Sequence, residues 1–250
     1  MPVFNKVDIE TEAEFIDLVP LGDIHFGNEV FTKDGLDKLR GYIKWIMERP
    51  GAFTILMGDI IESANIRGVY EMKQTPQEQM ETAVAEFKEL AEAGKILGSH
   101  SGNHEHWIKR DRGFDIAKIM AKDLKVKYLE DAAFHKVRVN EQNYHVYSTH
   151  GAGNATTPSG KIQKLVQMRQ SNAFDVGLKG HMHTKTVVPL VYNAVDNRGG
   201  FITQRKCFVM GTGHFLSEGG YAERCGYPYE PMGAPKVKLY ADKWDIHASQ

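Results

Sequence analysis

The stretch Phe53-Thr54-Ile55-Leu56-Met57-Gly58-Asp59 decides the fold, because it is a short apolar run that ends in a glycine and a carboxylate. A run of this length next to turn residues is typical of a buried strand. The same pattern occurs earlier, where Phe15 to Leu21 is followed by Gly22-Asp23. A third run, Lys95 to Ser99, leads to Gly102-Asn103-His104. We therefore predict three strands that each end in a polar loop.

Two helical stretches separate these strands. From Gly35 to Glu48, apolar residues recur at the spacing of one helical face, and Pro50-Gly51 ends the pattern. Pro76 to Ala93 is the second stretch, with Thr75 as the expected N-cap and Gly94 at its C-terminal end. A β-α-β-α-β order favours a largely parallel or mixed sheet covered by helices.

The second half of the chain is richer in strands. Phe134 to Val139 and Tyr144 to Ser148 flank the polar segment Asn140-Glu141-Gln142-Asn143, which predicts a hairpin. Further strand candidates are Phe174 to Lys179, Thr186 to Tyr192 and Lys206 to Met210. Ser217 to Pro235 is rich in Gly, Tyr and Pro, and we expect an ordered loop on the surface or over a functional site. Since no repeat or linker interrupts the chain, we interpret residues 1–250 as a single domain.

The composition is that of a globular protein, with 42% hydrophobic and 25% charged residues in a chain of 250. The net charge of -1 argues against a surface that wraps duplex DNA, although a local basic groove remains compatible with it. Only two cysteines occur, so a disulfide scaffold is excluded. The N-terminus lacks a signal-peptide pattern, and no apolar run is long enough to span a membrane. We therefore expect a cytoplasmic protein.

Five polar clusters carry the chemistry of the chain, and a glycine lies within two residues of each. They are Asp23-Ile24-His25, Gly58-Asp59, Gly102-Asn103-His104-Glu105, Thr149-His150-Gly151 and Gly180-His181-Met182-His183. Carboxylates and imidazoles without thiolates suit Mn, Fe, Zn, Ni or Co rather than a structural zinc site. In an extended segment, Asp-x-His points both donors the same way, and Asp59 is the obvious carboxylate to bridge two ions.

The ordered set of these motifs resembles the calcineurin-like metallophosphoesterase superfamily, of the stand-alone kind found in bacteria and phages. The resemblance runs from Asp23 to His183, about two thirds of the chain. It implies an α/β fold in which a two-sheet β-sandwich is flanked by helices (α/β/β/α).

The resemblance also implies the ligands of two divalent ions, for which Mn²⁺ is our first expectation. Asp23, His25, Asp59 and His183 would hold one ion, and Asp59, Asn103, His150 and His181 the other. A hydroxide that bridges the ions would attack phosphorus in line. His104 would not bind metal but would contact a phosphoryl oxygen and help to protonate the leaving oxygen.

Residues around these motifs are candidates for substrate contact. His106 and His214 could face the substrate, and Arg110 could neutralise a phosphate or belong to a solvated charge run. The remaining histidines, His100, His135, His145 and His247, we interpret as surface or packing residues.

One departure from the family pattern bears on the substrate. Protein phosphatases of the superfamily carry Gly-Asp-x-x-Asp-Arg-Gly, whereas Glu62-Ser63-Ala64 stands at the matching place here. No arginine is there to clamp the dianionic end of a monoester, although Arg67 could reach in. We therefore expect a phosphodiesterase that acts on nucleotide-like diesters.

The alternatives are a DNA exo- or endonuclease of the same superfamily, a phosphomonoesterase, and a catalytically dead metal-binding module. The last is disfavoured because Asp59, His104, His150, His181 and His183 are all present. A nucleotide or a short nucleic acid would be the partner; the sequence defines no oligomeric state.

Overall fold

Two β-sheets form the centre of the computed structural model, which describes residues 1–63, 72–153, 155–195 and 199–250. The five-stranded sheet has the order β11-β10-β2-β3-β4. Its strands are β2 (Phe15–Leu21), β3 (Ala52–Leu56), β4 (Ile96–Ser99), β10 (Lys236–Tyr240) and β11 (Ile246–Ser249). β2, β3 and β4 run parallel, which brings their carboxyl ends to one edge.

The second sheet has six strands in the order β1-β5-β6-β7-β9-β8. They are β1 (Val3–Ile9), β5 (Ala132–Val139), β6 (Gln142–Thr149), β7 (Val176–Lys179), β8 (Lys185–Val195) and β9 (Ile202–Thr212). β6, β7 and β9 are parallel neighbours, so their carboxyl ends also meet at one edge.

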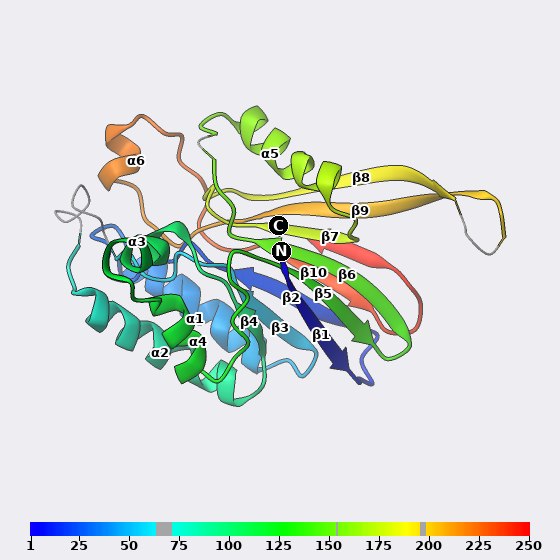
Figure 1. Cartoon of the computed structure of the whole chain (residues 1–250), viewed down its shortest axis with the longest axis horizontal. Coiled ribbons are helices and arrows are strands. Elements are labelled where there is room, and N and C mark those ends of the chain that lie inside the picture. The colour runs from blue at the N-terminus through cyan, green and yellow to red at the C-terminus, as the bar shows by residue number, and fades with distance from the viewer. Residues whose placement is uncertain (64–71, 154, 196–198) are drawn as a thin grey trace.

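Helices cover the outer faces of both sheets (Figure 1). α1 (Lys33–Met47), α2 (Pro76–Glu92) and α4 (Ile116–Asp123) share one apolar core with the five-stranded sheet. α5 (Pro158–Ser171) packs through Leu165 and Met168 on the outer face of the other sheet. Two further helices, α3 (Asn103–Arg112) and α6 (Gly220–Arg224), lie at the same end of the molecule.

A separate core lies between the sheets, where Leu18 and Ile55 of one sheet pack with Val137 and Val146 of the other. The architecture is therefore helix, sheet, sheet, helix, and the predicted α/β two-sheet sandwich is confirmed. No helix in the described part of the chain is long and apolar enough to cross a membrane.

The predicted elements of the first half match closely. β2 has the predicted bounds, and α2 begins with a capping box in which Thr75 accepts from the backbone N–H of Glu78. This box satisfies N–H groups that have no partner within the helix, which is why the helix begins there.

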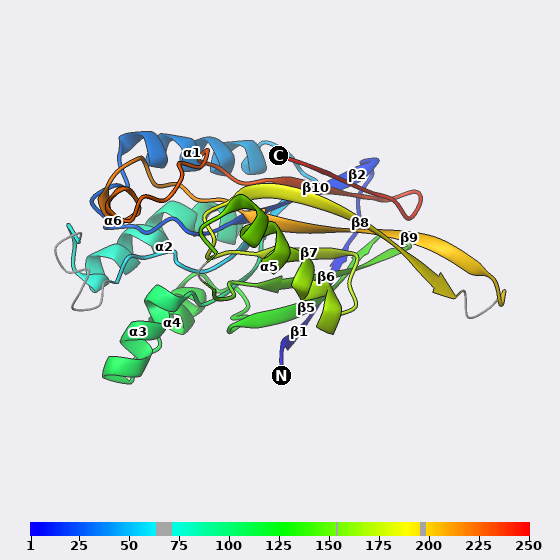
Figure 2. The same ribbon diagram turned by 90° about the horizontal axis from the view of Figure 1, so that it is seen from above.

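Four of the five strands predicted in the second half are longer than predicted, whereas β7 begins at Val176 rather than at Phe174. β8 and β9 are 11 residues each, and both views show their outer ends extending beyond the rest of the sandwich (Figures 1 and 2). The β5–β6 turn is shorter than predicted, because Val139 already pairs with Gln142 and Asn140 takes the left-handed conformation. β1, β10, β11 and the helices α3, α4 and α5 lack a sequence prediction altogether. The predicted loop from Ser217 to Pro235 contains α6.

Candidate metal centre

The polar clusters of the sequence lie at the carboxyl ends of the strands, on loops and in the first turn of α3. Five of their residues have a positive φ angle although they are not glycine: Asp23 (50°), His25 (57°), Asp59 (46°), His181 (68°) and His183 (50°). This conformation is uncommon for side chains other than Asn, Asp and Gly, and such strain persists only where the surroundings enforce it. It gathers at functional sites, and here it coincides with five predicted ligands.

Direct contact between two loops enforces part of this strain. A Cβ atom on Gly102 would lie 2.1 Å from Oδ1 of Asp59, so only glycine allows the loops to approach this closely. Asp23 N and His25 N donate to Gly58 O and Asp59 O, both at 3.0 Å. The loops after β2, β3 and β4 are thereby joined into one platform.

The side chain of Glu105 holds the loops after β3 and β4 together. Its carboxylate is buried and accepts from four backbone N–H groups: Asp59 (3.0 Å), Ile60 (2.8 Å), Ile61 (3.1 Å) and Gly102 (2.8 Å). Burial and the nearby Asp59 carboxylate raise the pKa of Glu105, while these N–H donors oppose that rise.

Nitrogen and oxygen atoms of the predicted metal ligands gather in two groups beside these three loops. In the first, Nε2 of His183 lies 3.3 Å from Oδ1 of Asp23 and 3.2 Å from Nε2 of His25. In the second, Nε2 of His150 lies 3.2 Å from Oδ2 of Asp59 and 3.0 Å from Oδ1 of Asn103. Nδ1 of His181 approaches the same Asn103 oxygen at 2.6 Å.

Asp59 stands between the two groups. Its Oδ2 lies 3.2 Å from His150 in one group and 3.9 Å from Nε2 of His25 in the other. Its Oδ1 accepts from the backbone N–H of His104 at 2.9 Å, which fixes the carboxylate in this orientation. A carboxylate in this place can serve both groups at once.

The tautomers of two histidines leave lone pairs facing the centre. Nδ1 of His25 donates to Oε2 of Glu62 at 2.9 Å, and Nδ1 of His150 donates to Met57 O at 2.9 Å. Both partners are acceptors only, so in the neutral rings each Nε2 is an unprotonated lone pair. In the neutral rings these lone pairs face the Asp59 carboxylate, the Asn103 side-chain oxygen and the His183 ring. The arrangement fits a cation, and the donor set is suitable for holding metal ions.

The electrostatics of the buried side chains agree with this. Burial alone would raise the pKa of Asp59, yet His150, His104 and His25 together hold it well below its usual range. In Asp23, His183 and His150 likewise overcome burial and lower the pKa. Burial opposes a charge on His150, but Asp59, Asp23 and Glu105 raise its pKa to about 10. The buried carboxylates of Asp23 and Asp59 therefore favour a positive charge between the two groups of ligands.

His104 lies beside both groups. Its Nδ1 donates to Glu62 O at 2.5 Å, and its Nε2 lies 3.9 Å from Oδ2 of Asp59. The ring of Trp107 packs against it, with 4.2 Å between the ring centroids. Nε2 is thus directed toward the centre, and Trp107 covers one side of the imidazole.

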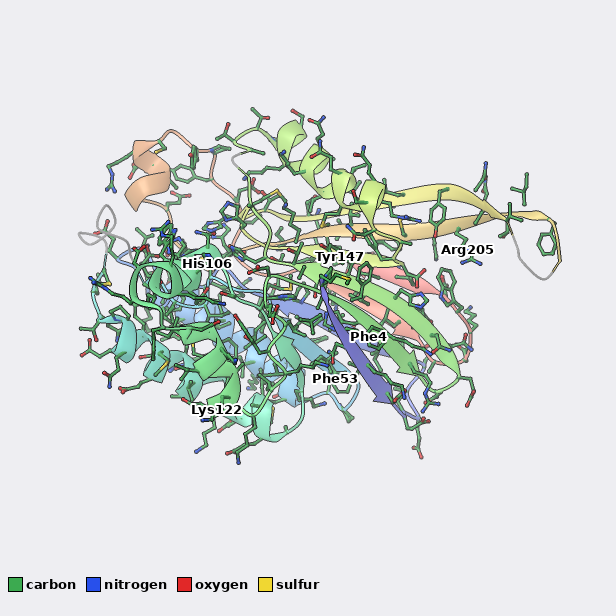
Figure 3. All side chains as sticks on the ribbon, viewed as in Figure 1. Phe4, Phe53, His106, Lys122, Tyr147 and Arg205 are labelled. Atoms are coloured by element: carbon green, nitrogen blue, oxygen red, sulfur yellow. The ribbon has the colours of Figure 1, made fainter. Side chains whose placement is uncertain are left out.

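The residues predicted to contact the substrate differ in their burial and in their distance from the metal ligands. His214 is buried, and its ring stacks on His183 with 5.4 Å between the centroids. His106 is exposed on α3, at the end of the molecule that also carries α6 (Figure 3). Arg110 is exposed and forms an ion pair of 2.6 Å with Asp111. Arg67 lies outside the described residues.

The loop from Ser217 to Pro235 is anchored next to the first group. Glu230 O accepts from Nε2 of His214 at 3.1 Å. The Glu230 carboxylate accepts from Lys161 at 2.9 Å and from Thr184 at 3.1 Å. This part of the loop therefore lies beside His183 rather than on a remote surface.

Three residues of the site escaped sequence reasoning. Glu62 was noted only as a departure from a motif, Glu105 only as part of Asn-His-Glu, and Trp107 not at all. The signal for Glu62 was its position three residues after Asp59, and that for Trp107 its position three residues after His104 on one helix.

Comparison with known proteins adds little to this geometry. No family model matches the chain, and no curated protein matches it either. Among solved structures, the chain is similar to a conserved uncharacterized protein from Streptococcus pneumoniae TIGR4 described as a predicted phosphoesterase. The TM-score is 0.40 at 11% identity, over 94% of this chain and 88% of that chain. A similarity this weak assigns neither family nor activity.

Proposed function

We propose that the chain is a metal-dependent phosphoesterase, with residues 1–250 as one catalytic domain and two divalent ions, Mn²⁺ first among them. Asp23, His25, Asp59 and His183 would hold one ion. Asp59, Asn103, His150 and His181 would hold the other. The observation that carries the proposal is the convergence of imidazole nitrogens on the Asp59 carboxylate, since Nε2 of His150 lies 3.2 Å and Nε2 of His25 3.9 Å from its Oδ2.

The chain's own residues have separable tasks in this proposal. Two ions, when bound, would supply a water of lowered pKa and offset the charge of the phosphate. Asn103 contributes a neutral oxygen, which leaves the centre receptive to an anion. His104, whose Nδ1 is committed to Glu62 O, presents Nε2 to a phosphoryl or leaving oxygen and can deliver a proton there.

A phosphodiester is the substrate that these residues favour. The residues directly after Asp59 are Ile60, Ile61 and Glu62, and Glu62 is buried with its carboxylate on His25. A buried carboxylate at this place would repel a dianionic phosphomonoester more than a monoanionic diester. A nucleotide-like diester is therefore the first candidate.

Hydrolysis by metal-stripped protein with Mn²⁺ added back tests the proposal. The panel consists of bis-para-nitrophenyl phosphate, para-nitrophenyl phosphate, cyclic nucleotides, and single- and double-stranded DNA. We expect metal-dependent turnover, faster on the diester than on the monoester. Cleavage of DNA would identify a nuclease, and much faster monoester cleavage would contradict the diester preference. Two bound ions without turnover of any substrate would leave only a binding module.

A further inference from the structure

A groove of about 400 Å³ is lined by residues of α1 and of the start of β10. These two elements and the C-terminus lie on one side of the molecule (Figure 2). The walls of the groove come from α1, β2, β8 and β10, and it lies within the size range of sites for small organic molecules. None of the candidate metal ligands lines it. The groove is therefore distinct from the metal centre, although Lys185 in its wall stands two residues after His183.

Gly41 is the first observation that indicates a ligand in this groove. It lies in the middle of α1, where a glycine destabilises a helix relative to alanine. Its φ angle is not positive, and a Cβ atom added there would meet no atom of the described residues within 4 Å. Neither the backbone conformation nor packing against these residues requires glycine here. Open space at the helix backbone is what a ligand that packs directly on α1 would need.

The charge of the groove indicates the kind of ligand. Lys38, Lys185 and Lys236 line it, and within the described part of the chain the ammonium groups of Lys38 and Lys185 have no hydrogen bond or ion pair. The one side-chain carboxylate in the lining, Asp37, forms an ion pair with Lys33. Among the side chains, three ammonium groups against one paired carboxylate favour an anion, and an ammonium group is a common partner of phosphate.

Aromatic side chains form the rest of the wall. The hydroxyl of Tyr42 donates to Ala234 O at 2.9 Å and accepts from Ala234 N at 3.0 Å, so this ring is held in place. Trp45 lines the groove with Nζ of Lys236 5.0 Å from its ring centroid. A cation beside flat rings suits a ligand that joins a phosphate to a planar ring.

We propose that this groove binds an organic phosphate that carries a planar ring, of the size of a nucleoside monophosphate. The phosphate contacts the three lysines, and the remainder packs along Gly41 between Tyr42 and Trp45. The proposal does not depend on the activity of the metal centre.

Calorimetric titration of the full chain with adenosine monophosphate tests the proposal, in chelating buffer so that the metal centre is not loaded. We expect one site per chain, with inorganic phosphate and adenosine each binding at least tenfold more weakly than the nucleotide. G41L should weaken nucleotide binding at least tenfold without lowering Tm, because leucine fills the groove and is the better helix former. Lys185→Gln and Lys236→Gln should each weaken it severalfold. Lys44→Gln, on α1 outside the groove, is the matched control and should bind like the parent.

Four results would overturn the proposal. One is the absence of nucleotide binding at millimolar concentration. Another is binding that G41L leaves intact. The third is binding that appears only when metal is restored, which would place the nucleotide at the metal centre. Inorganic phosphate that binds as tightly as the nucleotide would show an anion site without recognition of the ring, and would likewise refute the ligand class.

Discussion

Oε2 of Glu62 accepts a hydrogen bond of 2.9 Å from Nδ1 of His25. The backbone oxygen of the same residue accepts from Nδ1 of His104. One residue thus sets the tautomer of a proposed metal ligand and of the proposed acid. A carboxylate behind a ligating histidine orients the ring and makes its other nitrogen more basic.

Glu62→Gln should weaken the ion held by His25 about 10- to 100-fold, the usual effect of losing such a carboxylate. The amide oxygen can still accept the hydrogen bond, but the negative charge is lost. The ion held by His150 should keep its affinity. Titration with Mn²⁺, followed by calorimetry, measures both sites. Glu81→Gln, on the exposed face of α2, is the control, and equal affinities in Glu62→Gln and Glu81→Gln would refute this role of Glu62.

His104→Ala should retain both ions and lower kcat by about 10²- to 10⁴-fold, the usual contribution of a positioned acid. The imidazole is held by Glu62 O with Nε2 toward Asp59, but it belongs to neither proposed ligand set. Metal analysis together with steady-state kinetics on bis-para-nitrophenyl phosphate checks this. Loss of an ion in His104→Ala would show that the imidazole is itself a ligand.

Glu105→Gln should lower the free energy of unfolding by about 2 to 6 kcal/mol. One carboxylate oxygen becomes an NH₂ group, so two buried backbone N–H donors lose their acceptor at about 1–3 kcal/mol each. Urea denaturation of the metal-free protein measures this. A loss below 1 kcal/mol would mean that the loops after β3 and β4 do not depend on this carboxylate.

A buried chain of hydrogen bonds joins two histidines outside the site. Ser148 Oγ lies 2.7 Å from Nε2 of His100 and 2.6 Å from Nε2 of His135. Burial lowers the pKa of His100 to about 3 and that of His135 to about 4. Both rings are therefore neutral in the folded protein at physiological pH.

The stability of the protein should fall as the pH is lowered from about 6.5 toward 4. In the unfolded chain these histidines bind protons below about pH 6.5, whereas in the folded chain they resist protonation. The unfolded state then holds more protons, which costs up to about 1.4 kcal/mol per pH unit for each histidine. His135→Gln should make this dependence shallower by about one proton, as measured by urea denaturation between pH 4.5 and 7. An unchanged slope would show that His135 does not resist protonation in the folded state.

Much of the first half of the fold could be predicted, because its strands and helices have strong local patterns. Phe15 to Leu21 is a continuous apolar run, and Thr75-Pro76 carries its own helix-start signal. β10 and β11 could not be predicted in this way. β10 alternates buried and half-buried residues only because it pairs with β2, more than 200 positions earlier in the chain.

The candidate site shows the same division. The motifs identified the residues that gather around Asp59, because strand ends in parallel sheets meet at one edge. Glu62 was missed because its contact with His25 joins two loops that are far apart in the sequence. Trp107 was missed because its contact with His104 depends on α3, a helix for which there was no prediction. Likewise, His100 and His135 were interpreted as surface or packing residues, and only the sandwich brings both to Ser148. The metal-ligand assignments themselves stay predictions until ions are observed.

Anomalous diffraction from crystals of the Mn²⁺-loaded protein tests the central claim most directly. The account predicts two manganese peaks separated by about 3.5–4 Å, as in two-metal sites. One peak should be bound by Asp23, His25 and His183, the other by Asn103, His150 and His181, with Asp59 bound to both. A single peak, no peak, or manganese bound away from Asp59 would contradict it.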